Sequence, residues 1–220
     1  TPLFSSVSNS DAEMVRSLLE NGAEPDEPSD SADGRTALCL ACTDDKNGLE
    51  IVRLLLKHDA RPGRMATFDE GTSPLFAAVS SGRPRIAKEL LREVPRPPVD
   101  AECGKEGLTA LVFAAKEGRS EFVSMLLEAK ADANVECKGG LRFGAGRSID
   151  PLAAAAENRH SESVRLILAE GKLKLEGRNS PTKLLRRYAQ YPSVSKLLKQ
   201  HLGMYGDRPS GGSGVSSSKQ

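Results

Sequence analysis

Residues 107–134 have the sequence GLTALVFAAKEGRSEFVSMLLEAKADAN, in which a glycine separates two short helical patterns. Thr109 precedes the first pattern as a predicted N-cap, because its side-chain oxygen can accept a hydrogen bond from a free N–H group of the first turn. Gly118 follows that pattern, where a left-handed residue can end a helix and turn the chain. Apolar residues recur at helical spacing from Phe122 to Leu127. The stretch predicts a helix–turn–helix unit.

The same pattern recurs along the chain. Each unit begins at a Thr, Ser or Asp, here called its anchor, and four of the six anchors precede a proline, which suits the first helical position. The anchors are Thr1, Thr36, Ser73, Thr109, Asp150 and Ser180, at intervals of 35, 37, 36, 41 and 30 residues. Each of the first five units continues with a second amphipathic segment, within residues 14–19, 51–55, 86–91, 122–127 and 164–168. A fixed period of this length predicts a repeat array of helix pairs.

The composition agrees with thin repeated layers. The 220 residues include no tryptophan and only 4% aromatic residues, whereas one deep core usually buries large aromatic side chains. The formal net charge of +1 excludes a uniformly basic nucleic-acid binder. Charge is nevertheless uneven, because residues 1–60 hold 5 Lys/Arg against 12 Asp/Glu, and residues 138–220 hold 15 against 6. We therefore expect an acidic beginning and a basic end.

The predicted cellular compartment follows from two features that the sequence lacks, a membrane-spanning segment and a signal peptide, and from its few cysteines. No apolar run approaches the roughly 18 residues that cross a bilayer, and the N-terminus has no signal-peptide pattern. Four cysteines are too few for a disulfide scaffold and fit a reducing compartment. The sequence predicts a cytoplasmic or nuclear protein.

The repeats resemble those of the ankyrin family, whose signature is T-P-L-H-x-A with a period of about 33 residues. The resemblance covers residues 1 to about 201, and residues 107–134 carry it most closely. It implies an all-α solenoid of stacked helix-turn-helix units with protruding hairpin loops. The predicted array covers residues 1–202, and a disordered Gly/Ser-rich tail is predicted for residues 203–220. Since the chain begins on an anchor, we expect residue 1 to be a boundary within a longer protein.

The family resemblance also implies a function. Ankyrin arrays bind other proteins through a concave face and loop tips, so the chain is expected to be a non-catalytic protein-interaction module without cofactor, metal or small-molecule substrate. The implied contact residues lie at the exposed end of each first helix and around each loop tip. They are Asp33, Arg35, Thr43, Asp44, Asp69, Glu70, Thr72, Ser80, Ser81, Lys105, Glu106, Lys116, Glu117, Glu157 and Asn158.

Several residues depart from the family pattern. The signature histidine is replaced by Phe4, Cys39, Phe76, Val112 and Ala153, so we expect apolar packing in place of its usual hydrogen bond. Asp59 and Lys130 stand where a glycine normally ends the second helix, which costs free energy at a left-handed position. In the third unit Pro95-Arg96-Pro97-Pro98 replaces this turn. Gly48, Gly82 and Gly118 are predicted to separate first from second helices.

The sequence motifs that could indicate catalysis, metal binding or phosphate binding are weak. Cys39 and Cys42 form a lone C-x-x-C, which packing in a first helix explains better than redox chemistry or half of a zinc site. Cys103 and Cys137 are predicted repeat copies in loops, too far apart for a disulfide. His58, His160 and His201 match no catalytic order. The glycines at residues 139–146 are not followed by the G-K-[ST] ending that a phosphate-binding loop needs. The insertion from Val135 to Ile149 that contains them also presents Lys138, Arg142, Phe143 and Arg147 as candidate contact residues.

Two alternatives stay open. The chain could be the targeting or regulatory ankyrin segment of a larger enzyme or multidomain protein. Less favoured is contact with nucleic acid or an anionic membrane through the basic end, which includes Lys183, Arg186, Arg187, Lys196 and Lys199. A solvated capping face is the favoured explanation of these charges.

Overall fold

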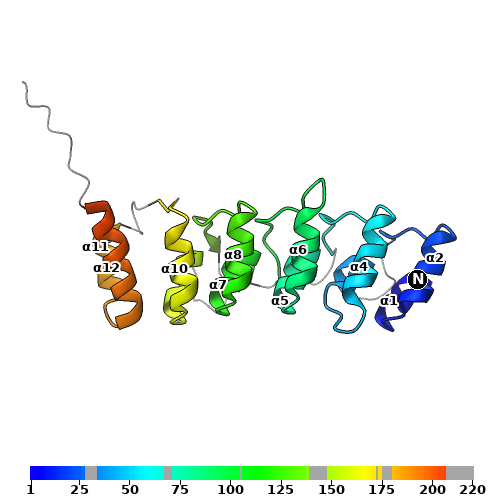
Figure 1. The fold of residues 1–220 in the computed structure, drawn as a ribbon, viewed down its shortest axis with the longest axis horizontal. Helices are drawn as coiled ribbons and strands as arrows, with labels where there is room; N and C mark the ends of the chain where they lie inside the picture. Colours follow the sequence, from blue (N-terminus) through cyan, green and yellow to red (C-terminus); the bar gives the residue numbers. More distant parts are fainter. Residues whose placement is uncertain are drawn as a thin grey trace, which may run out of the picture. The chain divides into compact units, whose positions relative to one another are not determined.

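The computed structural model describes residues 1–27, 34–66, 71–104, 106–138, 148–171, 173–174 and 180–206. The chain divides into two compact units, Thr1–Leu173 and Lys174–Gln220, which are called unit 1 and unit 2. Unit 1 consists of helix pairs arranged in single file (Figure 1). The first and second helices of the pairs are α1 (Pro2–Ser8) and α2 (Ala12–Glu20), α3 (Ala37–Ala41) and α4 (Gly48–Lys57), α5 (Pro74–Ser80) and α6 (Pro84–Arg92), α7 (Ala110–Lys116) and α8 (Ser120–Glu128), and α9 (Pro151–Glu157) and α10 (Ser161–Ala169).

The anchors begin the first helices as the sequence predicts. The side chains of Thr1, Thr36, Ser73, Thr109 and Asp150 each accept a hydrogen bond from the backbone N–H three residues later, at distances of 2.7–3.3 Å. All of these anchors except Thr1 are buried. Ser180 makes no such bond, although it also precedes a helix. The five bonded anchors therefore each satisfy a backbone donor inside a packed layer.

This difference between the anchors predicts that replacing them by alanine lowers the free energy of unfolding by different amounts. Thr109→Ala removes the acceptor for the Val112 N–H in a site that is 0% exposed, and it should lower the free energy of unfolding by about 1 kcal/mol. Ser180→Ala removes no cap bond and should change it by less than about 0.3 kcal/mol. Urea unfolding followed by circular dichroism measures both. Equal losses would contradict the assignment of caps.

The turns between first and second helices use left-handed residues. Gly82 and Gly118 adopt φ of 70° and 69°, as predicted, whereas Ser10 and Arg159 take the corresponding places at 55° and 63° without being glycine. The prediction for Gly48 was wrong, because Gly48 is the first residue of α4. A Cβ at this position would lie 2.7 Å from the Ala41 carbonyl oxygen. Gly48 is therefore required for close approach rather than for a left-handed turn.

The ends of the second helices also match the predicted pattern. Gly22, Asp59 and Lys130 have φ of 85°, 66° and 71°, so two side-chain-bearing residues occupy the left-handed position. The third unit differs, because α6 ends at Arg92 and its C-cap residue, Glu93, is extended rather than left-handed. The chain then continues through an exposed Val94 into the proline-rich segment. The second helix of the third unit therefore ends differently from those of the other units, where the proline-rich segment replaces the usual turn.

Each layer of unit 1 is thin. First helices pack on neighbouring first helices and second helices on neighbouring second helices, along the series α1-α3-α5-α7-α9 and α2-α4-α6-α8-α10. Small residues of the first helices permit close packing, and the alanines from Ala153 to Ala156 are all buried. Leucine, isoleucine and valine from the second helices complete each layer. The core is thus a row of small contacts between adjacent pairs.

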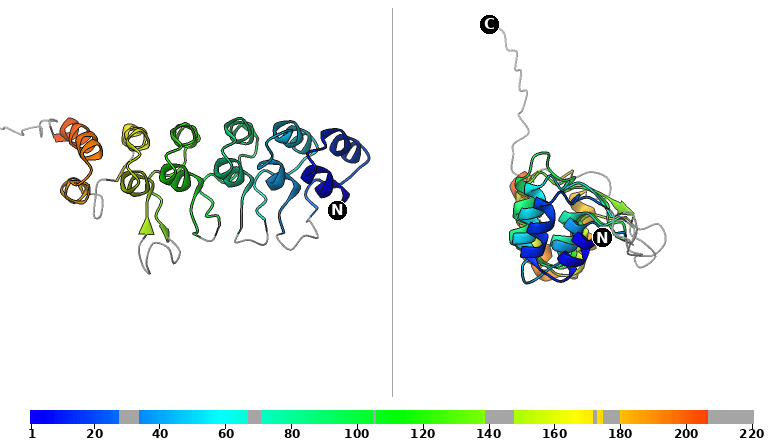
Figure 2. Two further views of the ribbon diagram at one scale, coloured as in Figure 1. Left: turned by 90° about the horizontal axis from the view of Figure 1, so that it is seen from below. Right: turned by 90° about the vertical axis from the view of Figure 1, so that its right-hand side faces the viewer.

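Loops extend from the helix pairs beyond the first helices, on the side away from the second helices (Figure 2). The loop before α9 contains β1 (Cys137–Lys138) paired antiparallel with β2 (Ser148–Ile149), and an isolated bridge joins Cys103 to Leu108 in the loop before α7. These pairings correspond to the predicted hairpins. Residues 28–33, 67–70, 105 and 139–147, which include the predicted contact residues Asp33, Asp69, Glu70 and Lys105, lie outside the described part.

Unit 2 contains α11 (Pro181–Arg187) and α12 (Pro192–Gly206), which pack against each other. Leu184, Tyr188, Val194 and Leu198 are buried in this unit. The helix α12 continues through residues 203–206, four residues past the predicted end of the array. Residues 207–220 lie outside the described part. A single array over residues 1–202 stays a prediction.

Candidate partner-binding surface

The exposed ends of the first helices form one row on neighbouring helices of unit 1. The predicted residues Ser80 and Ser81 end α5, Lys116 and Glu117 end α7, and Glu157 and Asn158 end α9. Glu117, Glu157 and Asn158 are exposed, and the other three are half-buried. We call this row, together with the loops that precede the first helices, the inner face. Of the predicted residues, Asp33, Asp69, Glu70 and Lys105 lie outside the described part.

An ion pair links helix and loop in the fourth helix pair. The Nζ atom of Lys116 lies 2.8 Å from Oε2 of Glu106, and each side chain retains 23% of its exposure. Glu106 belongs to the loop before α7, whereas Lys116 is the last residue of α7. The pair therefore links the loop before α7 to the C-terminal end of that helix on the inner face.

Several other predicted residues are engaged within the protein. The Thr43 and Ser80 hydroxyls donate to the Leu40 and Ala77 carbonyls at 2.8 and 3.1 Å. Asp44 accepts from the Lys46 and Asn47 N–H groups at 3.1 and 3.2 Å. Burial raises the pKa of Asp44, but hydrogen bonds outweigh it and hold that pKa below its ordinary value. Asp44 thus organises the loop before α4.

Two phenylalanines on the first helices were not predicted as surface residues. Phe76 and Phe113 are half-buried, and their rings meet edge to face with centroids 5.3 Å apart. Arg119 lies over the Phe113 ring at 5.6 Å and donates to the Val79 carbonyl. Lys116 and Glu117 follow Phe113 by three and four residues, so they share its face of α7. The signal in the sequence was two aromatic residues at adjacent, non-equivalent positions of neighbouring repeats.

Arg35 and Thr72 lie just before the anchors Thr36 and Ser73 and are half-buried. The Cys39 thiol donates to the Thr72 carbonyl at 3.4 Å. The expectation of purely apolar packing was therefore wrong at Cys39, because its thiol bonds to the adjacent repeat from the place of the signature histidine. This bond holds Thr72 next to the first helix.

All four cysteines are free and buried. Burial raises the pKa of Cys39 to about 11 and also raises the pKa of Cys42, Cys103 and Cys137. Cys103 donates to the Ser73 hydroxyl at 3.5 Å, and Cys137 accepts from the Thr109 N–H at 3.4 Å. The predicted packing role is consistent with these surroundings, because the thiolate form is disfavoured.

The buried thiols predict slow labelling. At pH 8 the native protein should react with dithionitrobenzoate at least about 100-fold more slowly than in urea, because reaction needs an exposed thiolate. A Ser8→Cys variant provides the control, since Ser8 is exposed on α1. In this variant one additional thiol should react with the reagent at once. Fast labelling of the unmodified native protein would contradict the burial of the cysteines.

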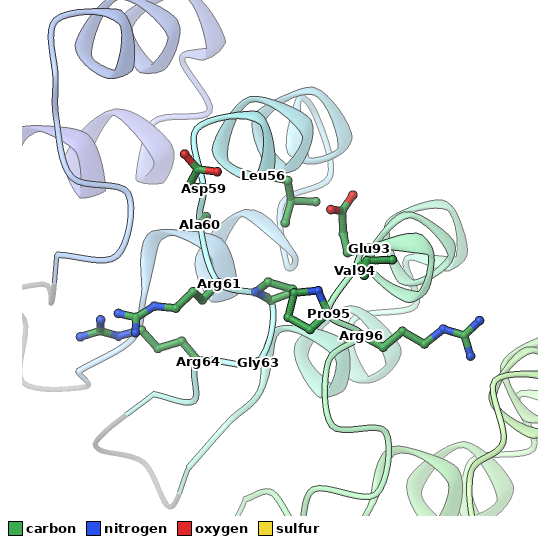
Figure 3. A pocket seen from close by; sticks show the side chains of 11 residues that line it. Leu56, Asp59, Ala60, Arg61, Gly63, Arg64, Glu93, Val94, Pro95 and Arg96 are labelled. Carbon is green, nitrogen blue, oxygen red and sulfur yellow. The ribbon is translucent and has the colours of Figure 1, made fainter.

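A pocket of about 530 Å³ lies away from the first-helix ends, where α4 and α6 end (Figure 3). Apolar atoms of Leu56, Val94 and Pro95 line it. The side chains of Arg61 and Arg64 extend to one side and that of Arg96 to the other. Arg61 is paired with Asp26 at 2.6 Å. Asp59 and Glu93 complete a rim of mixed charge, which selects no single ligand charge.

No metal-binding cluster is found in the described part of the chain. No group of three or more His, Cys, Asp or Glu residues there could hold a metal ion. His160 packs against Gly118, and burial lowers the pKa of His201. Among the helices in the described ranges, none is long and apolar enough to span a membrane.

Unit 1 is a helical-repeat array in which the row of first-helix ends lies beside projecting loops. Residues 1–66, 63–139 and 94–179 match the family model for ankyrin repeats in three copies. The chain belongs to the ankyrin-repeat family. Ankyrin repeats are generally protein-binding and typically non-catalytic, and only ankyrin repeats were found in this chain.

Three relatives show how the similarity is distributed. The chain is 35% identical over 135 residues to the ankyrin repeat protein nuc-2 of Neurospora crassa, covering 61% of this chain and 12% of that protein. It is 36% identical over 124 residues to the B-cell lymphoma 3 protein homolog of Mus musculus, covering 56% of this chain and 25% of that protein. It is 44% identical over 63 residues to the human ankyrin repeat and MYND domain-containing protein 1, covering 27% of this chain and 6% of that protein. The chain thus spans a quarter or less of each relative's length.

Proposed function

We propose that this ankyrin stack is a non-catalytic interaction module that binds a partner protein through the inner face. The observation that carries the proposal is the half-buried pair of Phe76 and Phe113 beside the polar ends of α5 and α7. Aromatic side chains surrounded by polar residues are typical of binding hot spots. The module acts in the cytoplasm or nucleus.

The charges beside the aromatic pair define the partner's chemistry. Glu117 and Glu157 are exposed on adjacent first helices, and Lys116 is already paired with Glu106. A complementary partner segment presents an apolar side chain to Phe76 and Phe113 and a cationic side chain to Glu117. Asp44, Thr43 and Ser80 act as supports rather than contacts, because their side chains bond within their own loops and helices.

Reversing two inner-face charges tests the proposal. A photo-crosslinking residue at position 117 first captures the partner from the native cell, and calorimetry then measures its affinity. The double variant Glu117→Arg/Glu157→Arg should weaken binding at least about tenfold while leaving helicity unchanged. Glu20→Arg/Glu121→Arg makes the same charge change on the exposed sides of α2 and α8 and should stay within twofold. Equal affinity of both variants would remove the inner face from the proposal.

A second candidate is that the stack targets or regulates a larger enzyme or multidomain protein. The small share of each relative that the chain spans favours it. The full-length reading frame tests this candidate, since an adjoining catalytic domain would support it. The two candidates are compatible, because a targeting segment also binds a protein.

A further inference from the structure

The pocket at the ends of α4 and α6, called here the α4–α6 pocket, is formed partly by the segment in which the third helix pair differs from the others. After α6 the backbone of Glu93 is extended, with φ −64° and ψ 153°, and residues 93–96 all line the pocket. Among the large apolar side chains of the described part, only those of Met14 and Val94 are exposed, at 49% and 91%. Val94 thus presents an apolar side chain to solvent beside a pocket, where a partner can contact it.

The other wall of the pocket comes from the end of α4 and the loop that follows it. Leu56 and the buried residues Ala60 and Pro62 line the pocket there. This loop approaches the proline-rich segment closely, since a Cβ added at Gly63 would lie 3.2 Å from Cδ of Pro98. The volume of about 530 Å³ falls within the range of ligand pockets, about 300–1,000 Å³. The pocket therefore has room for one or two large apolar side chains.

The charges around the pocket are separated in space. Arg61 and Arg64 extend to one side and Arg96 to the other (Figure 3). Asp59 and Glu93 lie along a different margin, next to the ends of α4 and α6 (Figure 3). Neither Arg64 nor Arg96 forms an ion pair with another residue of the described part, and the Arg61 side chain is 69% exposed within its ion pair. The rim as a whole has no dominant sign, but cations flank the apolar centre on both sides.

We infer that the α4–α6 pocket binds a partner-protein segment in which one or two large apolar side chains are flanked on both sides by Asp or Glu. The apolar side chains fill the pocket against Leu56 and Val94, and the flanking carboxylates pair with Arg64 and Arg96. Pairs between arginine and carboxylate are charge-assisted and often bidentate. Asp59 and Glu93 repel a segment whose carboxylates face the helix ends, which sets the orientation of the segment. This site is independent of the inner face, because it lies away from the first-helix ends.

The probe is a fluorescein-labelled peptide with the sequence Glu-Glu-Leu-Phe-Glu-Glu, titrated with the full chain and followed by fluorescence anisotropy. We expect saturable binding with a Kd below about 1 mM. The control peptides Lys-Lys-Leu-Phe-Lys-Lys and Glu-Glu-Ser-Ser-Glu-Glu should each bind at least about tenfold more weakly, because the first lacks the carboxylates and the second the apolar side chains. All titrations are made at about 0.05 M salt, since higher salt screens exposed charges.

Variants of the chain locate the binding site. Arg64→Glu/Arg96→Glu reverses both flanking cations and should weaken binding of the acidic peptide at least about tenfold. Val94→Ser removes an apolar contact and should weaken binding about fivefold, with unchanged helicity because Val94 is exposed. Arg85→Glu/Arg186→Glu is the matched control, since it makes the same charge change at exposed positions outside the pocket. Its affinity should stay within about twofold.

Four results would overturn the inference. These are no saturable binding of the acidic peptide up to about 1 mM, equal affinity for the acidic and basic peptides, equal affinity of the pocket variant and its matched control, and unchanged affinity in Val94→Ser. Circular dichroism checks that each variant is folded. If Arg64→Glu/Arg96→Glu failed to fold, Val94→Ser and the control peptides would decide.

Discussion

Gly118→Ala is expected to lower the free energy of unfolding of unit 1 by about 3 kcal/mol. Two costs combine at this position. Gly118 has φ 69°, which an alanine adopts only with strain, and a Cβ there would lie 2.6 Å from Cε1 and 2.7 Å from Cγ of His160. Urea unfolding followed by circular dichroism measures the loss.

Two variants separate these costs. Gly22 has φ 85°, and an added Cβ would meet nothing within 4 Å, so Gly22→Ala carries backbone strain alone and should cost about 1 kcal/mol. The double variant Gly118→Ala/His160→Ala has no clash with the histidine ring. Its loss of unfolding free energy, measured relative to the single variant His160→Ala, should therefore fall to the loss caused by Gly22→Ala. If the cost of Gly118→Ala stayed the same without the histidine ring, steric contact with His160 would not be its cause.

Gly48→Ala should lower the free energy of unfolding by about 2–3 kcal/mol, although alanine is normally the better helix residue. Gly48 begins α4, and its added Cβ would lie 2.7 Å from the Ala41 carbonyl oxygen and 3.2 Å from Cδ1 of Ile86. The carbonyl belongs to backbone and cannot rotate away. Thermal unfolding and urea titration should both show the loss.

The control for Gly48 is a helical glycine with open surroundings. Gly203 lies in α12, where an added Cβ meets nothing within 4 Å, so Gly203→Ala should stabilise unit 2 by about 0.5–1 kcal/mol. Tyrosine fluorescence reports on unit 2, because the three tyrosines of the chain are Tyr188, Tyr191 and Tyr205. Stabilisation by Gly48→Ala would refute the close approach to Ala41.

The helix pairs could be predicted from the sequence because their signals are local. An anchor such as Thr109 needs only its own N-cap geometry, and the spacing of the second helices follows from their apolar residues. The role of Gly48 could not be predicted, because it depends on a carbonyl in the preceding helix. Ser10 and Arg159 were missed at left-handed turns since neither residue type signals that conformation.

The inner face could be located only approximately. The family pattern placed Glu117 and Glu157 at exposed helix ends, and the structure places them there. It did not reveal that Asp44 is engaged by backbone N–H groups, because those groups depend on how the loop before α4 folds. Nor did it show that the rings of Phe76 and Phe113 meet, since this contact joins side chains of two neighbouring repeats.

The layered contacts of unit 1 determine how unfolding spreads. Each helix pair packs mainly on the pairs next to it, so stability is approximately a sum of terms for single pairs and for adjacent interfaces. A weakened interface near Gly118 leaves the contacts among the first pairs intact. Denaturation of such a variant should then proceed in separate steps, and the denaturant dependence of each step gives the number of repeats that open together.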